Sequence, residues 1–117
     1  SFFADYAWFC GVSNATNSAG YQSQIVAQLN PNGFGLYDLH GNLWELGHNW
    51  KSENHFFDEN SFETGLDPVG PSTSLQRTRL GGFFGSKPYH LDFEYRFGYI
   101  PSNMANVNTF RLVRTSF

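Results

Sequence analysis

Residues 31–50 read PNGFGLYDLHGNLWELGHNW, and this stretch says most about the fold. Glycine and asparagine tolerate positive backbone φ, so PNG at 31–33 and GN at 41–42 predict two turns. The short run between them is too brief for a stable helix. Residues 43–50 alternate around two tryptophans, which predicts a strand. The stretch therefore predicts an irregular backbone that leads directly into a strand.

Short apolar runs elsewhere predict further strands separated by long connections. Residues 51–76 are polar and acidic, which favours a solvated excursion, and residues 85–108 are mostly loop. Neither repeats nor heptads are present. The sequence therefore predicts a single loop-rich α+β domain over residues 1–117, built on short strands. Besides 43–50, the expected strands cover residues 6–10, 25–29, 78–84 (broken by two glycines) and 110–114.

Charge and composition exclude several classes of partner. The 117 residues carry a net charge of −3, which argues against nucleic acid as a partner. No apolar run approaches the ~20 residues of a membrane span, and no signal peptide is visible. The single cysteine, Cys10, excludes an internal disulfide and argues against a cysteine-based zinc site. We expect a bacterial cell-surface or extracellular location, although no targeting signal identifies one.

Four motifs occur in an order that resembles one protein family. They are YAW at 6–8, PNGFGLYDLHGNLWE at 31–45, RLGGF at 79–83 and FRLVR at 110–114. Together they resemble the C-terminal half of the formylglycine-generating-enzyme, or sulfatase-modifying factor, domain. The resemblance implies a C-type-lectin-like fold whose first part is not in this sequence. We therefore expect a complementary N-terminal segment or another protein chain as a partner.

The resemblance also implies where a copper site would lie. Enzymes of the family carry two cysteines shortly after the Gly-Gly motif, where they bind Cu(I) and activate oxygen. The matching positions here are Ser86 and Leu91. Neither side chain supplies the soft thiolate that Cu(I) requires. Cys10 lies in an apolar stretch and is expected to be a small buried residue. Copper is therefore not an expected cofactor.

Calcium is the cofactor that the resemblance does imply, at Gly-Asn-x-Trp-Glu. Asn42 offers an amide oxygen, Glu45 a carboxylate, and the turn can present the Leu43 carbonyl, all hard ligands that suit calcium. The alternative is a purely structural turn in which Asn42 and Glu45 cap backbone groups. Asp38 is expected to brace the turn. Arg111 is expected to pair with a carboxylate such as Glu45 or Asp38.

The sequence also contains a run of aromatic residues between positions 83 and 100. Lectin-like folds tolerate wide variation here, and Tyr and His make effective contact residues. The alternative is that half of these rings fill a core begun by Trp44 and Trp50, and the sequence does not choose between the two. The predicted ligand-binding residues are Phe84, Ser86, Tyr89, His90, Phe93, Tyr95 and Tyr99.

Two functions from different classes follow. The first is a calcium-stabilised binding or assembly module without copper, whose ligand is a protein or a glycan. The second is an oxidoreductase of the formylglycine-generating and sulfoxide-synthase superfamily, whose metal site comes from a missing segment or a partner chain. The spacing of the four histidines matches no iron motif of that superfamily.

Overall fold

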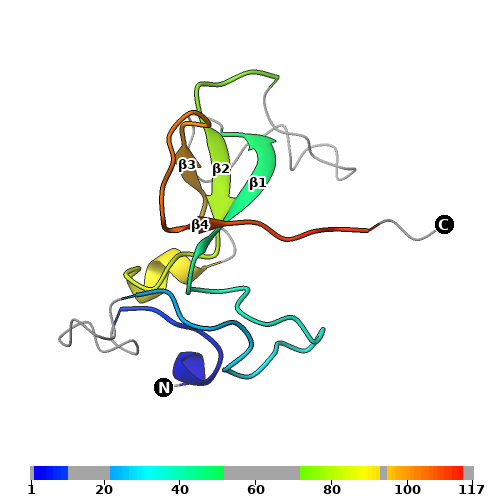
Figure 1. Ribbon diagram of the computed structural model, residues 1–117, viewed down its shortest axis with the longest axis vertical. Helices are drawn as coiled ribbons and strands as arrows, with labels where there is room; N and C mark the ends of the chain where they lie inside the picture. The colour runs from blue at the N-terminus through cyan, green and yellow to red at the C-terminus, as the bar shows by residue number, and fades with distance from the viewer. Residues whose placement is uncertain (1, 11–21, 52–71, 93–94, 115–117) are drawn as a thin grey trace.

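The computed structural model describes residues 2–10, 22–51, 72–92 and 95–114. Figure 1 shows a small sheet with irregular connections below it and an extended segment running out beyond β4. The elements are η1 (Phe2–Asp5), β1 (Trp44–Trp50), β2 (Arg77–Leu80), η2 (Pro88–Leu91), β3 (Phe97–Tyr99) and β4 (Asn108–Thr109), of which η1 and η2 are single 3₁₀ turns.

The four strands form one mixed sheet in the order β3-β2-β1-β4. β2 pairs antiparallel with both β1 and β3, whereas β4 pairs with β1 in parallel. The β1–β2 register shifts between Leu46 and Trp50, which marks a bulge. Thr78 lies so close to Gly47 there that a Cβ on the glycine would meet its hydroxyl at 2.4 Å. The short-stranded, loop-rich architecture that the sequence predicts is therefore confirmed.

A cluster of aromatic rings lies at the start of β1. Trp44, at the start of β1, is 3% exposed and packs between Phe83 and Phe97, at ring-centroid distances of 6.2 and 5.5 Å. The Arg79 guanidinium lies 4.9 Å from the ring centres of both Trp44 and Phe97. Such cation–π contacts stabilise a partly buried arginine. Part of the aromatic run of residues 83–100 therefore packs around Trp44, as one of the two sequence interpretations requires.

The strand predictions succeed only where a partner strand is present. Residues 43–50 form β1, and residues 78–84 form β2 only up to Leu80, because the Gly81-Gly82 pair turns the chain with φ of 86° and 73°. Residues 6–10 make one isolated bridge, between Trp8 and Gly41.

The predictions for residues 25–29 and 110–114 are wrong, since neither segment forms a strand. Both are mostly exposed, and among the described residues neither has a neighbouring strand to supply hydrogen bonds. β3 and the first residue of β4 lie within residues 85–108, which were predicted to be mostly loop. The predicted acidic excursion falls largely on residues 52–71, outside the described residues. Within the described ranges, no helix has the length and apolar character needed to cross a membrane.

Candidate functional site

A turn at residues 38–42 positions the start of β1. Gly41 has φ of 75°, and a Cβ there would lie 2.1 Å from the backbone oxygen of Trp8. Only glycine allows that approach together with that φ. The Asn42 N–H donates to the Trp8 carbonyl at 2.8 Å, and the Gly41 N–H donates to the Gly81 carbonyl at 2.6 Å. The turn is thus held from two sides by distant backbone.

The Asn42 side chain clamps a second loop onto this turn. Its Oδ1 accepts the Gln24 N–H at 2.8 Å, and its Nδ2 donates to the Gln24 carbonyl at 3.1 Å. Asn42 is 4% exposed and adopts a φ of 62°, which asparagine tolerates better than most residues. This predicted calcium ligand therefore already has a structural role.

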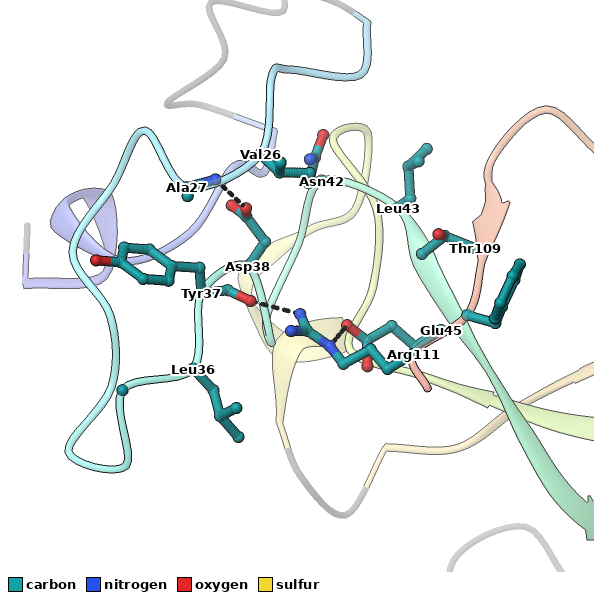
Figure 2. Close-up of a pocket in the computed structure, with 12 residues that line it drawn as sticks. Val26, Ala27, Leu36, Tyr37, Asp38, Asn42, Leu43, Glu45, Thr109 and Arg111 are labelled. Carbon is teal, nitrogen blue, oxygen red and sulfur yellow. Dashed lines mark hydrogen bonds and ion pairs between the residues drawn. The ribbon is translucent and has the colours of Figure 1, made fainter. Parts of the chain in front are cut away.

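A cavity of about 360 Å³ opens beside the turn and contains the predicted calcium ligands. Asn42, Leu43 and Glu45 all line it, together with Asp38 (Figure 2). Asp38 Oδ2 accepts the Ala27 N–H at 2.8 Å, whereas its buried Oδ1 has no hydrogen-bond partner within the described residues. A buried carboxylate oxygen without a partner is costly, so it marks a place where a cation or a water would be stabilised.

Arg111 closes one side of the cavity. Figure 2 shows its guanidinium directed at the Glu45 carboxylate and the Tyr37 carbonyl: Nε donates to Glu45 Oε1 and Nη2 to the Tyr37 oxygen. The predicted pairing of Arg111 with a carboxylate is therefore confirmed. Burial raises the pKa of Glu45 above its ordinary value of 4.5. The hydrogen bond and charge of Arg111 act in the opposite direction but do not cancel the effect of burial.

The raised pKa of Glu45 predicts a pH-dependent stability. The folded chain retains this proton to a higher pH than the unfolded chain, so stability falls as pH rises from 4.5 through the folded pKa. Glu45→Gln cannot titrate and serves as the reference. We expect the free energy of unfolding of the wild type to decrease relative to Glu45→Gln over this pH range, measured by urea unfolding. A difference that stays constant or grows in favour of the wild type would contradict the prediction.

The two positions that match the copper-binding cysteines lie together behind the turn. Ser86 is 1% exposed and Leu91 3% exposed. A Cβ at Gly82 would meet Leu91 Cδ2 at 2.8 Å and Ser86 Oγ at 3.1 Å, so both side chains border the same point. The Ser86 hydroxyl accepts the Phe83 N–H at 2.9 Å. His40 Nδ1 lies 2.6 Å from the Leu91 carbonyl, which ties this segment to the turn.

Cys10 is close to these positions, which its place in the sequence did not indicate. Its backbone N–H donates to the Ser86 carbonyl at 2.9 Å. Its side chain is partly exposed rather than buried as expected. The sequence signal that could have indicated this proximity is the YAW motif at 6–8. The β-bridge between Trp8 and Gly41 places the residues that follow Trp8 next to this segment.

The predicted ligand-binding residues separate into two groups. Phe84 and Ser86 are buried, so in this structure they belong to the core. Tyr89, His90 and Tyr95 form a mutual cluster with ring centroids 4.2, 4.7 and 6.2 Å apart.

Within that cluster, Tyr89 is 58% exposed. Burial, and then the nearby Lys87 charge, lowers the pKa of His90, so its imidazole is neutral at pH 7. Tyr99 lies half-buried on β3. Phe93 lies outside the described residues.

Comparison with known proteins identifies the family. The sequence model of one protein family, described as the sulfatase-modifying factor enzyme 1-like domain, matches residues 1–116. The chain belongs to this family. It is 36% identical over 87 residues to the formylglycine-generating enzyme of Mus musculus, and 43% identical over 70 residues to that of Thermomonospora curvata. These alignments cover 74% and 59% of this chain but only 21% and 23% of the two relatives, so the chain spans about a fifth of their length.

Solved structures support the fold of this sulfatase-modifying factor-like domain. Treponema denticola variable protein 1 matches with a TM-score of 0.73 and 24% identity, over 92% of this chain and 35% of that one. PvdO from Pseudomonas aeruginosa matches with a TM-score of 0.67 and 20% identity, over 92% of this chain and 38% of that one. At these identities the likeness concerns the fold alone. The α+β, C-type-lectin-like fold that the sequence predicts is confirmed.

Proposed function

We propose that this chain is a non-copper sulfatase-modifying factor-like domain that acts as a binding or assembly module. One observation carries the proposal: the two cysteine-matching positions lie side by side in the core, and they are occupied by Ser86 and Leu91. A hydroxyl and an aliphatic chain cannot replace two thiolates as Cu(I) ligands. Cys10 supplies a single thiol nearby, which is insufficient for the two-thiolate site.

Copper binding tests this proposal directly. The purified chain is titrated against a chromogenic Cu(I) chelator, and oxygen uptake is followed with a cysteine-containing peptide. We expect no withdrawal of Cu(I) from the chelator and no oxygen uptake above the free-copper background. Tight binding of one Cu(I) together with thiol-dependent oxygen consumption would contradict the binding-module proposal and favour an enzyme.

The second candidate function is an oxidoreductase completed by another segment. The identity to two formylglycine-generating enzymes favours it, since sequence relatives at 36% and 43% identity carry that name. Within the described residues, no group of three or more His, Cys, Asp or Glu side chains is placed to hold a metal. An enzyme of this kind would need ligands from beyond the described part of the chain, so it should gain metal-dependent oxygen uptake only when that segment is added.

The proposed contact surface is the ring cluster of Tyr89, His90 and Tyr95, together with Tyr99 on β3. Tyrosine and histidine combine contact area with a polar group and lose little side-chain entropy on binding. Tyr89 is the most exposed of the cluster. A protein or glycan ligand suits these rings, since both offer apolar faces next to hydrogen-bonding groups.

Calcium is proposed as a stabilising ion at the cavity beside the turn. Asp38, Asn42, Leu43 and Glu45 would hold it. The buried Asp38 Oδ1, which has no hydrogen-bond partner among the described residues, is the observation that fits a cation. Hard oxygens of this kind suit calcium. The ion would share the Asn42 and Glu45 oxygens with their present donors, Gln24 and Arg111.

Removing calcium tests the proposed calcium site. Because an ion that binds only the folded state stabilises it by mass action, the melting temperature should rise by several degrees between excess chelator and millimolar calcium. Asp38→Asn should abolish the shift, whereas Asp5→Asn, at an exposed carboxylate, should leave it unchanged. Superimposable melting curves of the wild type in chelator and in calcium would rule calcium out.

A further inference from the structure

Two arginines lie on the same face of the sheet. Arg77 and Arg79 are two positions apart on β2, whereas the buried Thr78 between them lies on the other face. The register places Trp50 of β1 opposite Arg77, and Phe97 of β3 opposite Arg79. Opposite residues of antiparallel strands share a face. We call the surface so formed the arginine face; its residues are Trp44, Leu46, Trp50, Arg77, Arg79 and Phe97.

Both guanidinium groups of this face are held in place. The Arg77 guanidinium lies 4.1 Å from the ring centre of Trp50, and its Nη1 donates to the His48 carbonyl. The Arg79 guanidinium, packed on two rings as described above, donates from Nη1 to Asn108 Oδ1 at 3.0 Å. A guanidinium carries five N–H donors, so each group keeps donors for a ligand. Their fixed positions lower the entropy lost when a ligand binds.

Neither arginine is paired with a carboxylate in the described part of the chain. The ion pair found there joins Arg111 to Glu45, and Glu45 lies on the opposite face of β1 from Leu46. Burial lowers the pKa of Arg79, an effect that a neighbouring carboxylate would oppose. A partly buried charge without a counter-charge is costly. The arginine face is therefore complementary to an anionic ligand.

The arginine face is open and continues into the contact surface proposed above. Leu46 is 37% exposed and Phe97 is 40% exposed, so a ligand can reach apolar surface beside the charges. Phe97 also stacks on Tyr95, with ring centroids 6.3 Å apart. Tyr95 belongs to the ring cluster with Tyr89 and His90. A single extended ligand can thus contact both surfaces.

The spacing of the two arginines selects the kind of anion. Residues two apart on a strand are separated by about 6.8 Å. An extended peptide places alternate side chains on one side at the same spacing. Carboxylates two residues apart in a peptide therefore match Arg77 and Arg79, whereas adjacent carboxylates point to opposite sides. Arginine is well suited to such partners, because its planar group binds a carboxylate through two N–H donors.

We propose that the arginine face binds an extended acidic peptide whose carboxylates lie two residues apart, one on Arg77 and one on Arg79. The proposal rests on the binding role proposed above and names the class of ligand. An aromatic side chain two positions beyond the second carboxylate lies toward Tyr95, since Tyr95 stacks on Phe97 next to Arg79. The aliphatic part of the peptide covers Leu46.

The test measures binding of a fluorescein-labelled peptide, Gly-Glu-Ser-Glu-Ser-Phe-Gly, to the full 117-residue chain by fluorescence anisotropy at low salt. We expect saturable one-to-one binding that weakens as salt is raised, because added ions screen the opposite charges. The isomer Gly-Glu-Glu-Ser-Ser-Phe-Gly has the same composition and charge but the wrong spacing. It should bind at least about fivefold more weakly, since only one of its carboxylates can reach an arginine.

Substitutions locate the binding site on the chain. Arg77→Gln should weaken binding of the first peptide by about tenfold, because it removes one charge-assisted pair. Arg114→Gln removes the same charge at an exposed arginine outside this face, so it should change the affinity by less than about twofold. Arg79→Gln should act like Arg77→Gln. Its folding is checked by thermal unfolding, and Arg77→Gln decides the question if Arg79→Gln does not fold.

Several results would contradict this ligand class. Equal affinity for the two isomers, or no binding of either, would overturn the proposal. Tighter binding of a galacturonate oligomer than of the peptide would also overturn it, in favour of an anionic glycan. The copper titration tests the module proposal separately. A chain that binds neither Cu(I) nor peptide would therefore refute the acidic-peptide proposal and leave the non-copper proposal standing.

Discussion

A Ser86→Cys/Leu91→Cys double variant is expected to withdraw one Cu(I) from a chromogenic chelator that the wild-type chain leaves fully loaded. The expectation follows from the positions of Ser86 and Leu91, which both border the point above Gly82. Two thiolates at these positions would supply the soft ligand pair that Cu(I) prefers. Each single variant should bind far more weakly than the pair.

Three controls make the copper result interpretable. Ser86→Cys/Leu75→Cys has the same number of thiols but places one of them at an exposed leucine elsewhere, so it should not bind. Cys10→Ser in the double variant removes the thiol whose backbone touches Ser86. Leu91→Cys leaves a small cavity and should cost about 1–3 kcal/mol of stability, so folding is checked by thermal unfolding.

Two results of the copper titration would contradict these expectations. A folded double variant that does not bind Cu(I) would show that the two positions do not form a ligand pair. Copper binding by the wild type would overturn the non-copper proposal itself.

The second large effect is expected at Gly41. Gly41→Ala places a Cβ 2.1 Å from the Trp8 oxygen at a φ of 75°. The backbone segments around Gly41 and Trp8 must then move apart, which breaks the hydrogen bond from the Asn42 N–H to the Trp8 carbonyl. We expect a loss of about 4 kcal/mol or more, comparable to the whole stability of a small domain, and hence loss of cooperative unfolding.

Two other glycines of the same stretch separate the effect of backbone strain from the effect of the contact with Trp8. Gly35 has a φ of 77° but open space around it, so Gly35→Ala should cost about 1–2 kcal/mol from backbone strain alone. Gly33 has open space around it and no left-handed φ, so Gly33→Ala should lie within about 0.5 kcal/mol of the wild type. Equal losses at Gly35 and Gly41 in urea unfolding would contradict the role given to the Trp8 contact.

Local sequence patterns predicted the features that local chemistry decides. The turn at 41–42 and the strand that follows it were recognisable because glycine, asparagine and tryptophan occur in a fixed order, and the structure places β1 at Trp44–Trp50. The pairing of Arg111 with Glu45 was also predicted, although it spans 66 positions. The prediction of this pairing came from the family resemblance, since no local pattern joins such distant residues.

Features that depend on distant partners were missed. Residues 110–114 are strand-like in sequence, yet a strand forms only where another strand supplies hydrogen bonds, and none does so within the described residues. The opposite error occurred at Phe97–Tyr99, which forms β3 because Arg77–Leu80 lies beside it. The aromatic run could not be divided between core and surface for the same reason: Phe97 packs on Trp44, which is far away in sequence.

The links across the turn have a consequence for motion. The segment of residues 81–91 is joined to the turn by the Gly41–Gly81, Phe84–Asn42 and His40–Leu91 hydrogen bonds, of 2.6, 2.8 and 2.6 Å. Each contributes about 0.5–1.5 kcal/mol, so separating the two segments means breaking all three together. We therefore expect the wall of the cavity and the Ser86–Leu91 position to move together. A hinge between them is disfavoured.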